Sequence, residues 1–383
     1  MSTSRRIIVK VGTNVLTNPD GLLDASTIAS LVSQIVALKA KGTEVILVSS
    51  GAMAAGRGVI CHGERSRTMT FRRRSTSRIS SFGSAQDDMR SRDDVANRQI
   101  LAAVGQVHLM KRYAELFDSH DALCAQVLAT KEDFRDRRHY LNMRGCFSSL
   151  LEEGIVPVVN ENDVVAVDEL MFTDNDELAG LIASMTDADA LLILSSVPGI
   201  MTGNPDHPRS KIIPEVRSDA DWKKYLRAGT SSFGRGGMHT KCETGRKMAS
   251  LGITTSICLG REPDVLLNIE SGKNPGTVFL PEKSKSSIKR WVAEGDGQEK
   301  GIITINTCAV EAITAEGRAR SLLPVGIVKI EGDFEKNDLL KIRDERGKDI
   351  GIGRAQYASA PAKEVMGKQG QKALIHYDYL YLS

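Results

Sequence analysis

The chain has 383 residues, of which 41% are hydrophobic and 26% are charged. This composition is typical of a soluble globular protein with room for two domains. The formal net charge is only +3, since 51 Lys and Arg side chains face 48 Asp and Glu side chains. A balance this close excludes a global electrostatic argument for binding nucleic acid or a membrane surface.

Targeting and redox features point to the cytoplasm. No apolar run reaches the length of a transmembrane helix, and the opening stretch MSTSRRIIVKVG lacks the apolar core of a signal peptide. The six cysteines are scattered and none forms a C-x-x-C pair, so neither a zinc site nor a disulfide framework is indicated. We therefore predict a cytoplasmic protein with unpaired thiols and no membrane anchor.

The first three predicted elements form one strand–helix–strand unit. Residues 5–12 are a short apolar run that ends at a glycine, and residues 43–52 are a second such run. Between them, residues 24–42 have apolar side chains at helical spacing, with Asp24 or Ser26 as the candidate N-cap. This order predicts two parallel strands joined by a crossover helix.

The same alternation continues to about residue 260. Strands are predicted at residues 122–130, 155–163, 190–199 and 253–260, and helices at residues 99–120, 137–154, 175–189 and 236–252. The strands are almost continuously apolar, which indicates that helices cover both faces of the sheet. We therefore predict an α/β domain at residues 1–282, a three-layer αβα sandwich with a mostly parallel central sheet.

The rest of the chain has a different pattern. Residues 283–297 are rich in charged residues and glycine, and we predict that they form a linker. Residues 298–383 contain several short strand-like runs, with one short helix predicted at residues 307–317. Many short strands in so few residues predict a small C-terminal β-barrel.

One segment, residues 62–94, fits neither pattern. It is rich in Arg, Ser and Asp with almost no apolar periodicity, which predicts a solvent-exposed insertion. Such an insertion is tolerated because the entropy cost of closing a loop grows slowly with its length. The arginine run at 72–74 leaves open a contact with nucleic acid, although acidic residues follow and no aromatic platform accompanies it.

Residues just after the predicted strands are the candidates for a site, because open α/β sheets bind ligands beyond the carboxyl ends of their strands. Lys10 lies inside the first apolar strand, where an unpaired ammonium group is costly. It is either an anion-binding lysine beside the backbone N–H groups of residues 12–14 or a lysine whose head reaches solvent at the strand end. The small residues 49–52 let a ligand approach the backbone, but small residues also permit close helix packing.

A second candidate region combines carboxylates and amides. Residues 160–163 read Asn-Glu-Asn-Asp at a strand end, and residues 174–176 read Asp-Asn-Asp at the start of a helix. Capping explains part of this set, because Asn and Asp are good N-caps and acidic residues suit a helix N-terminus. The remainder suits the ammonium group of an amino acid, and its repulsion of phosphate requires a lysine or a metal nearby.

The glycine-rich stretch GRGGMHTK, residues 234–241, precedes a predicted helix. It does not match the P-loop pattern, in which Lys comes before the hydroxyl residue. Its N–H groups can still form an anion site at the positive end of the helix. Lys241 at the start of the helix opposes the helix dipole unless an anion compensates. Two lysines, glycine turns and an acidic, amide-rich pocket together predict a kinase without a P-loop.

Six segments occur in an order that resembles the glutamate 5-kinases of the amino acid kinase family: IIVKVGTNVLT, SSGAMAAGR, LAAVGQ, IVPVVNEND, DNDELAG and GRGGMHTK. The match runs through about Pro281, and the tail ARSLLPVGIVKIEGDFEKNDLLKIRDERGKDIG resembles a PUA domain. The resemblance implies phosphorylation of the side-chain carboxylate of L-glutamate by ATP with Mg²⁺, the first step of proline synthesis. It also implies inhibition by proline, a homo-oligomer and a downstream glutamyl-phosphate reductase as partner.

The resemblance further implies roles for individual residues. Lys10 and Lys241 neutralise the transferring phosphoryl group, and Asp176 holds the two lysines in place. The implied substrate-binding set is Ser50, Asn160, Asp163, Asp174 and Asn175. The implied nucleotide-binding set is Lys10, Ser195, Ser196, Arg235, Gly236, Gly237, Met238, His239, Thr240 and Lys241, and no residue is assigned to a metal. A general base is not needed, because a carboxylate nucleophile is already ionised at neutral pH.

Three features depart from the family pattern. Ser195-Ser196 stands where Thr-Asp is usual, Thr173 replaces a glycine, and the segment 62–94 is longer than the usual connection. Two other functions therefore stay open: an RNA-binding protein acting through the PUA-like tail, and a weakly active homologue that binds glutamate or proline. The tail's few aromatic candidates for stacking on bases are Tyr357, Tyr377, Tyr379 and Tyr381, and packing is the alternative role for them.

Overall fold

The computed structural model describes residues 5–66, 85–135, 137–165, 174–203, 207, 209–223, 225, 237–273, 275–281, 299–314 and 320–382. The chain divides into two compact units, Met1–Glu282 and Lys283–Ser383, each with a sheet of its own. The predicted linker at 283–297 lies outside the described residues.

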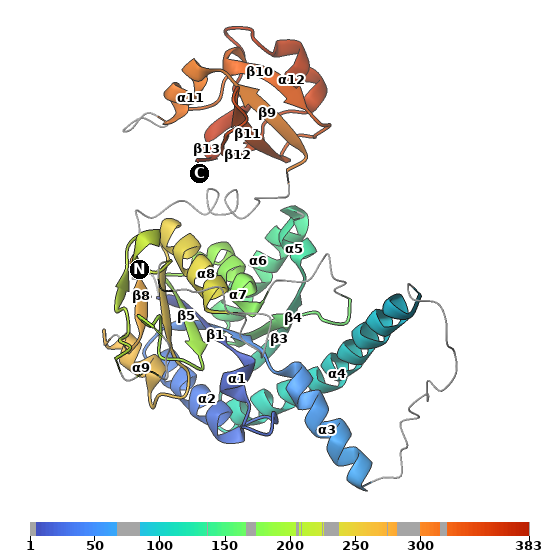
Figure 1. The fold of residues 1–383 in the computed structure, drawn as a ribbon, viewed down its shortest axis with the longest axis vertical. Helices are drawn as coiled ribbons and strands as arrows, with labels where there is room; N and C mark the ends of the chain where they lie inside the picture. The colour runs from blue at the N-terminus through green and yellow to red at the C-terminus, as the bar shows by residue number, and fades with distance from the viewer. Residues whose placement is uncertain are drawn as a thin grey trace. The chain divides into compact units, whose positions relative to one another are not determined.

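An eight-stranded sheet forms the centre of the first unit (Figure 1). Its strands are β1 (Arg6–Val11), β2 (Glu44–Ser49), β3 (Cys124–Ala129), β4 (Val156–Glu161), β5 (Ala190–Ser195), β6 (Glu215–Val216), β7 (Thr254–Leu259) and β8 (Thr277–Phe279). Their order across the sheet is β3-β4-β2-β1-β5-β7-β8-β6, and every neighbouring pair is parallel except β7 with β8. The prediction of a mostly parallel sheet is confirmed.

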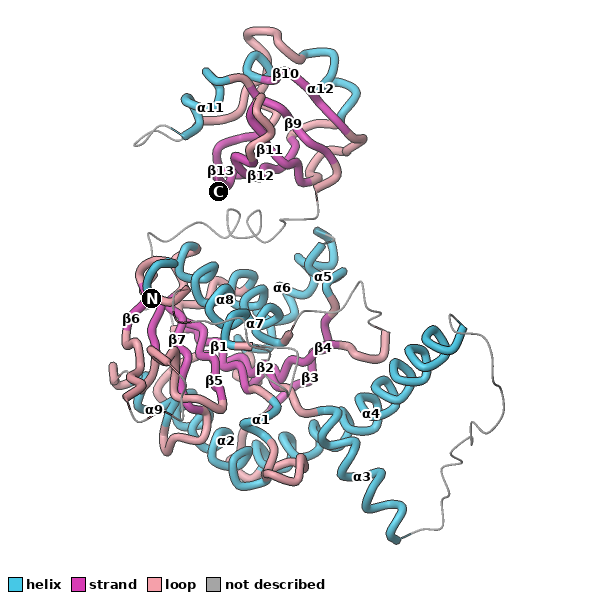
Figure 2. The backbone as a smooth tube through the Cα atoms, viewed as in Figure 1, coloured by secondary structure: helices cyan, strands magenta, loops and turns pink. Residues whose placement is uncertain are grey.

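Helices cover both faces of this sheet, which confirms the predicted three layers (Figures 1 and 2). One layer contains α2 (Ala25–Ala40), α4 (Ala85–Asp118) and α9 (Val265–Glu270), and the other contains α6 (Arg137–Glu152), α7 (Asn175–Met185) and α8 (Met238–Ser250). Shorter or peripheral helices of the unit are α1 (Thr13–Leu16), α3 (Ala52–Ser66), α5 (Lys131–Arg135) and the 3-10 turn η1 (Asp219–Asp221).

The periodicity of α2 explains how the layers join. Ile28, Leu31 and Ile35 recur at helical spacing, are at most 2% exposed, and pack into the core beneath the sheet. Asp24 is the N-cap of α2, because its carboxylate accepts hydrogen bonds from the backbone N–H groups of Ser26 and Thr27. Hydrogen bonds from Ser26 first, and then from Thr27, lower the pKa of Asp24 to about 2.

The parallel arrangement brings four chain segments to one edge of the sheet. β4, β2, β1 and β5 are consecutive neighbours, so their carboxyl ends lie side by side. The residues that follow these ends belong to the segments singled out in the sequence, and this edge is where ligands bind in open α/β sheets.

Helices α3 and α4 cross at unusually short range. A Cβ atom on Gly56 would lie 2.1 Å from the carbonyl oxygen of Leu101, and one on Gly105 would lie 1.7 Å from that of Ala52. Only glycine fits at either position, so the crossing point of the two helices is fixed.

The two described ends of the segment 62–94 are helical, which its composition did not predict. α3 extends to Ser66, and α4 begins at Ala85 rather than near residue 99. The absence of apolar periodicity was a poor guide here, because Ala, Gln, Met and Arg have good intrinsic helix propensity without it. Residues 67–84, including the arginine run at 72–74, lie outside the described residues.

The second unit contains a five-stranded sheet in the order β10-β9-β11-β12-β13 (Figure 2). Its elements are β9 (Gly301–Ile305), α11 (Thr307–Thr314), the 3-10 turn η2 (Pro324–Gly326), β10 (Ile327–Glu331), β11 (Leu339–Asp344), β12 (Asp349–Ala355), α12 (Ser359–Val365) and β13 (Ile375–Leu382). Ile303, Leu340 and Ile342 are fully buried in its core. The strand-like runs seen in the sequence are confirmed, whereas α12 was not predicted.

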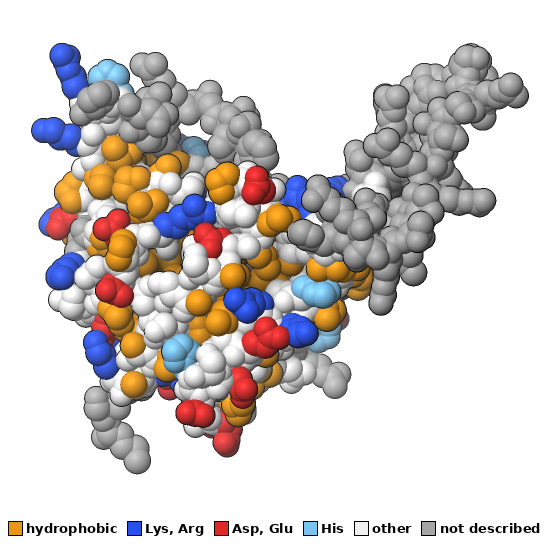
Figure 3. Space-filling view, turned by 90° about the horizontal axis from the view of Figure 1, so that it is seen from below, with side chains coloured by type: hydrophobic (Ala, Val, Ile, Leu, Met, Phe, Trp, Pro, Cys, Tyr) orange, Lys and Arg blue, Asp and Glu red, His pale blue; other side chains and the backbone are white. Residues whose placement is uncertain are grey.

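Charged side chains of both signs are interspersed on the face of the molecule in Figure 3. This distribution agrees with the near balance of acidic and basic residues. Among the residues that the structure describes, no helix has both the length and the apolar character needed to cross a membrane.

Candidate active site

Three charged side chains from three elements meet at the carboxyl edge of the sheet. The Nζ atom of Lys10, on β1, lies 2.6 Å from Oδ1 of Asp176 on α7, and Nζ of Lys241, on α8, lies 2.7 Å from Oδ2 of the same carboxylate. Asp176 is fully buried, and the two lysines are 4% and 8% exposed. This charged trio unites the three residues that the family resemblance assigned to catalysis.

Burial and charge act against each other in the charged trio. Burial lowers the pKa of Lys10, although the carboxylate of Asp176 favours the charged form. Burial also opposes the ionisation of Asp176, but the two lysines outweigh it and hold its pKa below the ordinary value. With both lysines protonated, the trio has one excess positive charge in a buried place, which attracts an anion.

Asp174 links α7 to α8. It is the N-cap of α7, since its Oδ1 accepts from the backbone N–H groups of Asp176 and Glu177 at 2.9 and 3.1 Å. Its Oδ2 accepts from the hydroxyl of Thr240 at 2.7 Å. Burial, followed by repulsion from Asp176, raises the pKa of Asp174. Capping thus explains part of the acidic and amide-rich set, as the sequence suggested.

The N-terminus of α8 lies beside the charged trio. Gly237 is its N-cap, and as a glycine it has no side chain that could accept from the N–H groups of the first turn. Backbone N–H groups at such an end are ready-made partners for an anion. The side chain of His239 has other partners, because its Nδ1 lies 3.3 Å from Oε2 of Glu243 and its ring meets Trp222 edge-on at 5.7 Å, so only its backbone N–H is a candidate for this role. The predicted phosphate residues Arg235 and Gly236 lie outside the described residues.

Amide side chains form a second group at the same edge. Nδ2 of Asn175 lies 2.8 Å from Oγ of Ser50 and 3.2 Å from Oδ1 of Asn160. Nδ2 of Asn160 donates to Oε1 of Gln106 at 2.9 Å. We call Gln106, Asn160 and Asn175 the amide relay. Three of the predicted substrate residues, Ser50, Asn160 and Asn175, are therefore in direct contact.

The other predicted site residues lie close in sequence to these groups. Asp163 is half-buried in the turn that follows β4, and Glu161, the last residue of β4, is buried. Ser195 ends β5 and is 6% exposed, with its Oγ accepting from the backbone N–H of Val197 at 3.4 Å. Ser196 is exposed beyond the strand.

Two residues near the site were missed by the sequence analysis. Gln106 sits in the middle of α4, away from any strand end, and only its place in the segment LAAVGQ could have drawn attention to it. Arg261 follows β7 and binds the carbonyl groups of Asn14, Val15 and Thr17 at the end of α1. It thereby fixes the turn that follows Lys10.

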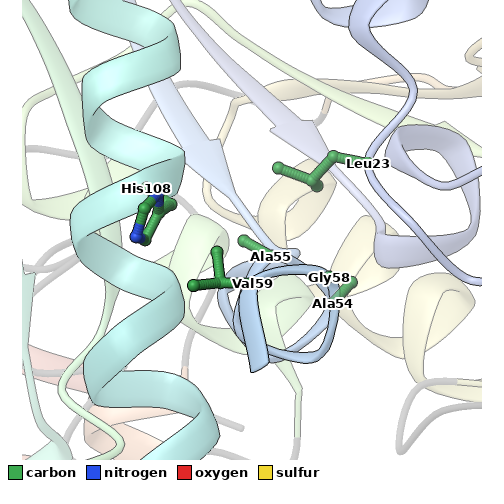
Figure 4. A pocket seen from close by; sticks show the side chains of 6 residues that line it. All are labelled: Leu23, Ala54, Ala55, Gly58, Val59 and His108. Carbon is green, nitrogen blue, oxygen red and sulfur yellow. The ribbon is translucent and has the colours of Figure 1, made fainter. Parts of the chain in front are cut away.

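An apolar hollow lies outside the charged and amide groups. Leu23, Ala54, Ala55, Gly58, Val59 and His108 line it, between the loop before α2 and the helices α3 and α4 (Figure 4). None of its lining residues belongs to the charged trio or the amide relay. The site described above is therefore an edge of the sheet rather than this hollow.

Comparison with known proteins agrees with this architecture. The amino acid kinase family model matches residues 5–258, and the PUA domain model matches residues 301–376. Glutamate 5-kinase from Bacteroides thetaiotaomicron is 46% identical over 380 residues, covering 98% of both chains. Glutamate 5-kinase from Chlorobaculum tepidum is 48% identical over 383 residues, covering 99% of this chain and 97% of that protein.

A solved structure supports the fold alone. Carbamate kinase from Giardia lamblia bound to AMP-PNP superimposes with a TM-score of 0.50 at 15% sequence identity, covering 74% of this chain and all of that chain. The chain belongs to the amino acid kinase family and has a PUA domain at its C-terminal end. Within that family, the relatives that match it at 46–48% identity over nearly their whole length are the glutamate 5-kinases.

Proposed function

We propose that this chain transfers the γ-phosphoryl group of ATP to the side-chain carboxylate of L-glutamate, forming L-glutamyl 5-phosphate in the first step of proline synthesis. The observation that supports this most directly is the charged trio at the carboxyl edge of the sheet. The relatives named glutamate 5-kinase, similar over almost the whole chain, supply the identity of the substrate.

The charged trio suits the needs of phosphoryl transfer, which are positioning and neutralisation of charge rather than covalent chemistry by the protein. An ammonium group has three N–H donors. Lys10 and Lys241 each direct one donor to Asp176 and keep others for the oxygens of the transferring group. Because Asp176 is buried and its pKa is held low, it fixes both lysines without taking up a proton.

The chemistry of the acceptor removes the need for a general base. The glutamate carboxylate is ionised at neutral pH, so one of its oxygens attacks the γ-phosphorus directly while the bond to the bridging oxygen of ADP breaks. Asp174 is not a base in this scheme, since both its oxygens already accept hydrogen bonds. The lysines, whose side chains are buried, stabilise the charge that develops on the transferring oxygens.

Nucleotide binding is assigned to the N-terminus of α8, where Gly237, Met238, His239 and Thr240 precede Lys241. Mg²⁺ is expected to arrive with the phosphates, because proteins hold it through phosphate oxygens, water and one or two carboxylates. Within the described part of the chain, no group of three or more His, Cys, Asp or Glu side chains is arranged as a metal cage. Inhibition by proline, homo-oligomerisation, a cytoplasmic location and a downstream glutamyl-phosphate reductase extend this proposal by resemblance.

Trapping the acyl phosphate tests the proposal. With glutamate, ATP, Mg²⁺ and hydroxylamine, the parent protein should form glutamyl hydroxamate. Lys241→Ala should reduce that rate by a factor of about 10² or more, because one of the two neutralising groups is lost. Lys273→Ala is the matched control, since Lys273 is exposed and its Nζ contacts Oδ1 of Asn268 rather than Asp176, and it should keep the parent rate.

A folded parent protein that forms no hydroxamate with glutamate or other amino acids would contradict the kinase function. That result would favour the two other functions, a weakly active homologue or an RNA-binding protein acting through the tail. RNA binding by the tail has less support, because Tyr379, one of its aromatic candidates for stacking on bases, already has the guanidinium of Arg354 3.5 Å from its ring centre. One face of that ring is thus already covered by protein.

A further inference from the structure

The orientation of Asn160 is fixed by the backbone. Its Oδ1 accepts from the N–H of Glu161 at 2.9 Å, and a backbone N–H can only donate. The amide nitrogen of Asn160 must therefore point the other way, where it meets Oε1 of Gln106 at 2.9 Å. Gln106 supplies the acceptor that holds the buried Asn160 amide in this one orientation.

That orientation determines which end of Asn175 remains available. Oδ1 of Asn160 and Oγ of Ser50 both face the amide nitrogen of Asn175. Both N–H bonds of Asn175 are then used, and its Oδ1 has no hydrogen-bond partner among the described residues. Asn175 is half-buried at the start of α7, so this oxygen is an acceptor open to a ligand.

Another glutamine of α4, Gln99, contacts the turn that follows Asn160 and the end of β4. Nε2 of Gln99 donates to the carbonyl oxygen of Val164 at 2.9 Å. Gln99 and Gln106 are seven residues apart, about two turns of helix, so they lie on one face of α4. The segment from Asn160, near the end of β4, to Val164 includes Asp163 and is thus held by α4 at both ends.

The crossing of α3 and α4 fixes Gln106 in space. Gly105 precedes it and lies against the backbone of Ala52, the first residue of α3, with no room for a side chain. Ser50 lies just before α3. Further along α4, Leu109 and Tyr113 are buried in the core, and the hydroxyl of Tyr113 lies 2.8 Å from Oγ of Ser49. A shift of α4 that moved Gln106 away from Asn160 would therefore also disturb the contacts of Gly105, Leu109 and Tyr113.

We propose that Gln106 is a positioning residue that sets the polarity of the amide relay and so presents Asn175 Oδ1 as the acceptor for the ammonium group of the amino-acid substrate. This inference rests on the proposed function for the class of substrate. It predicts that Gln106 controls affinity for the amine-bearing substrate, whereas the charged trio controls the transfer step. The ligand to compare with glutamate is glutarate, a dicarboxylate of the same length that lacks the amine.

The test compares binding of glutamate and glutarate to the full chain by calorimetry with a non-hydrolysable ATP analogue present. Gln106→Leu removes the acceptor, and it should weaken glutamate binding about tenfold or more with little change for glutarate. Gln106→Glu keeps an acceptor of the same length, and it should keep the preference of the parent for glutamate within about threefold. Val107→Ala, at the next and 68% exposed position of α4, is the control for helix perturbation.

The outcomes separate this inference from the proposed function. Equal loss of glutamate and glutarate binding in Gln106→Leu, or no loss of either, overturns the positioning role. Loss of the preference in both Gln106→Leu and Gln106→Glu overturns it too, because the acceptor is retained in the second variant. A parent that binds glutamate but forms no hydroxamate contradicts the kinase function alone. A parent that does not distinguish glutamate from glutarate overturns the amine-binding role of the relay.

Discussion

The charged trio and the amide relay lie at the same edge of the sheet, but the trio consists of ionic groups and the relay of neutral amides. The trio has two ammonium groups that share one buried carboxylate, and its contacts are 2.6 and 2.7 Å. The relay has neutral amides, each with one orientation set by its neighbour. Charge in the trio is strong but does not distinguish one anion from another, whereas the relay distinguishes donors from acceptors.

This difference suggests a division of labour between rate and selectivity. Buried charge acts on whichever phosphoryl oxygens reach it, and its effect is largest where charge develops during the reaction. Oriented amides act on the ground state, since a ligand that cannot supply the matching donor leaves a polar group unpaired. Changes in the trio should therefore alter turnover, and changes in the relay should alter substrate affinity.

The largest effect is expected from Asp176→Asn. The change leaves two buried ammonium groups without a carboxylate, which should lower the free energy of unfolding by about 3–5 kcal/mol. Turnover should fall by a factor of at least about 10². Urea unfolding and the hydroxamate assay measure the two effects. A variant with parent stability and turnover would show that the trio is not electrostatically coupled.

The relay should give a large effect of a different kind in Asn175→Leu. The substitution removes the open acceptor, so glutamate affinity should fall about 10- to 100-fold. Affinity for the ATP analogue should stay within about threefold of the parent value, because the contacts of the charged trio are retained. Calorimetric titration of each ligand measures this. Equal losses of both affinities would contradict the division of labour.

Gly105→Ala tests the scaffold of the relay without touching a polar group. A Cβ atom here would lie 1.7 Å from the carbonyl oxygen of Ala52, so α3 and α4 must separate. The expected cost is about 1–3 kcal/mol in the free energy of unfolding. Glutamate affinity should fall with it, since Gln106 and Ser50 move apart, while nucleotide affinity should not. Gly145→Ala is the control, because a Cβ atom there meets nothing within 4 Å.

The smallest expected effect concerns pH, and only ionic residues should show it. The pKa of Asp174 is raised, so from about pH 3.8 to its raised value the folded state binds more protons than the unfolded state. Its contribution to stability therefore falls as pH rises through that window. Asp174→Asn keeps an N-cap residue but does not titrate. Its free energy of unfolding, relative to that of the parent, should therefore increase as the pH rises from 4 to 6.

The neutral relay supplies the comparison for that measurement. Asn175→Leu removes no titrating group, so its stability difference from the parent should be the same at pH 4 and pH 6. Urea unfolding midpoints at the two pH values decide the matter. A constant difference for Asp174→Asn, or one that moves the other way, would falsify the link between the burial of Asp174 and its titration.

The sequence predicted the trio better than the relay, and the reason is geometric. Lys10 and Lys241 stand where a lone ammonium group is unfavourable, in an apolar strand and at a helix N-terminus, so the need for a counter-charge is visible locally. The pairing of both lysines with Asp176 was implied by family resemblance. Gln106 has no such local signal, because an interior glutamine on an amphipathic helix is usually solvated.

The fold shows the same contrast. Long apolar strands such as β5 and well-capped helices such as α2 were predictable from periodicity and caps alone. The short strands β6 and β8, of two and three residues, were not, since their pairing depends on tertiary contacts. The close approach at Gly56 and Gly105 was also invisible, because a glycine in a helical pattern has no distinctive sequence signal.

Arg261 has a consequence for the order in which the chain can assemble. Its guanidinium binds the end of α1, across a sequence separation of 246 residues to Val15. Short α1, with four residues, cannot be stable as an isolated helix. During synthesis from the N-terminus, the contacts that hold the turn after Lys10 therefore cannot be complete until the arginine that follows β7 has been added. The first loop of the site to be translated is among the last to be completed.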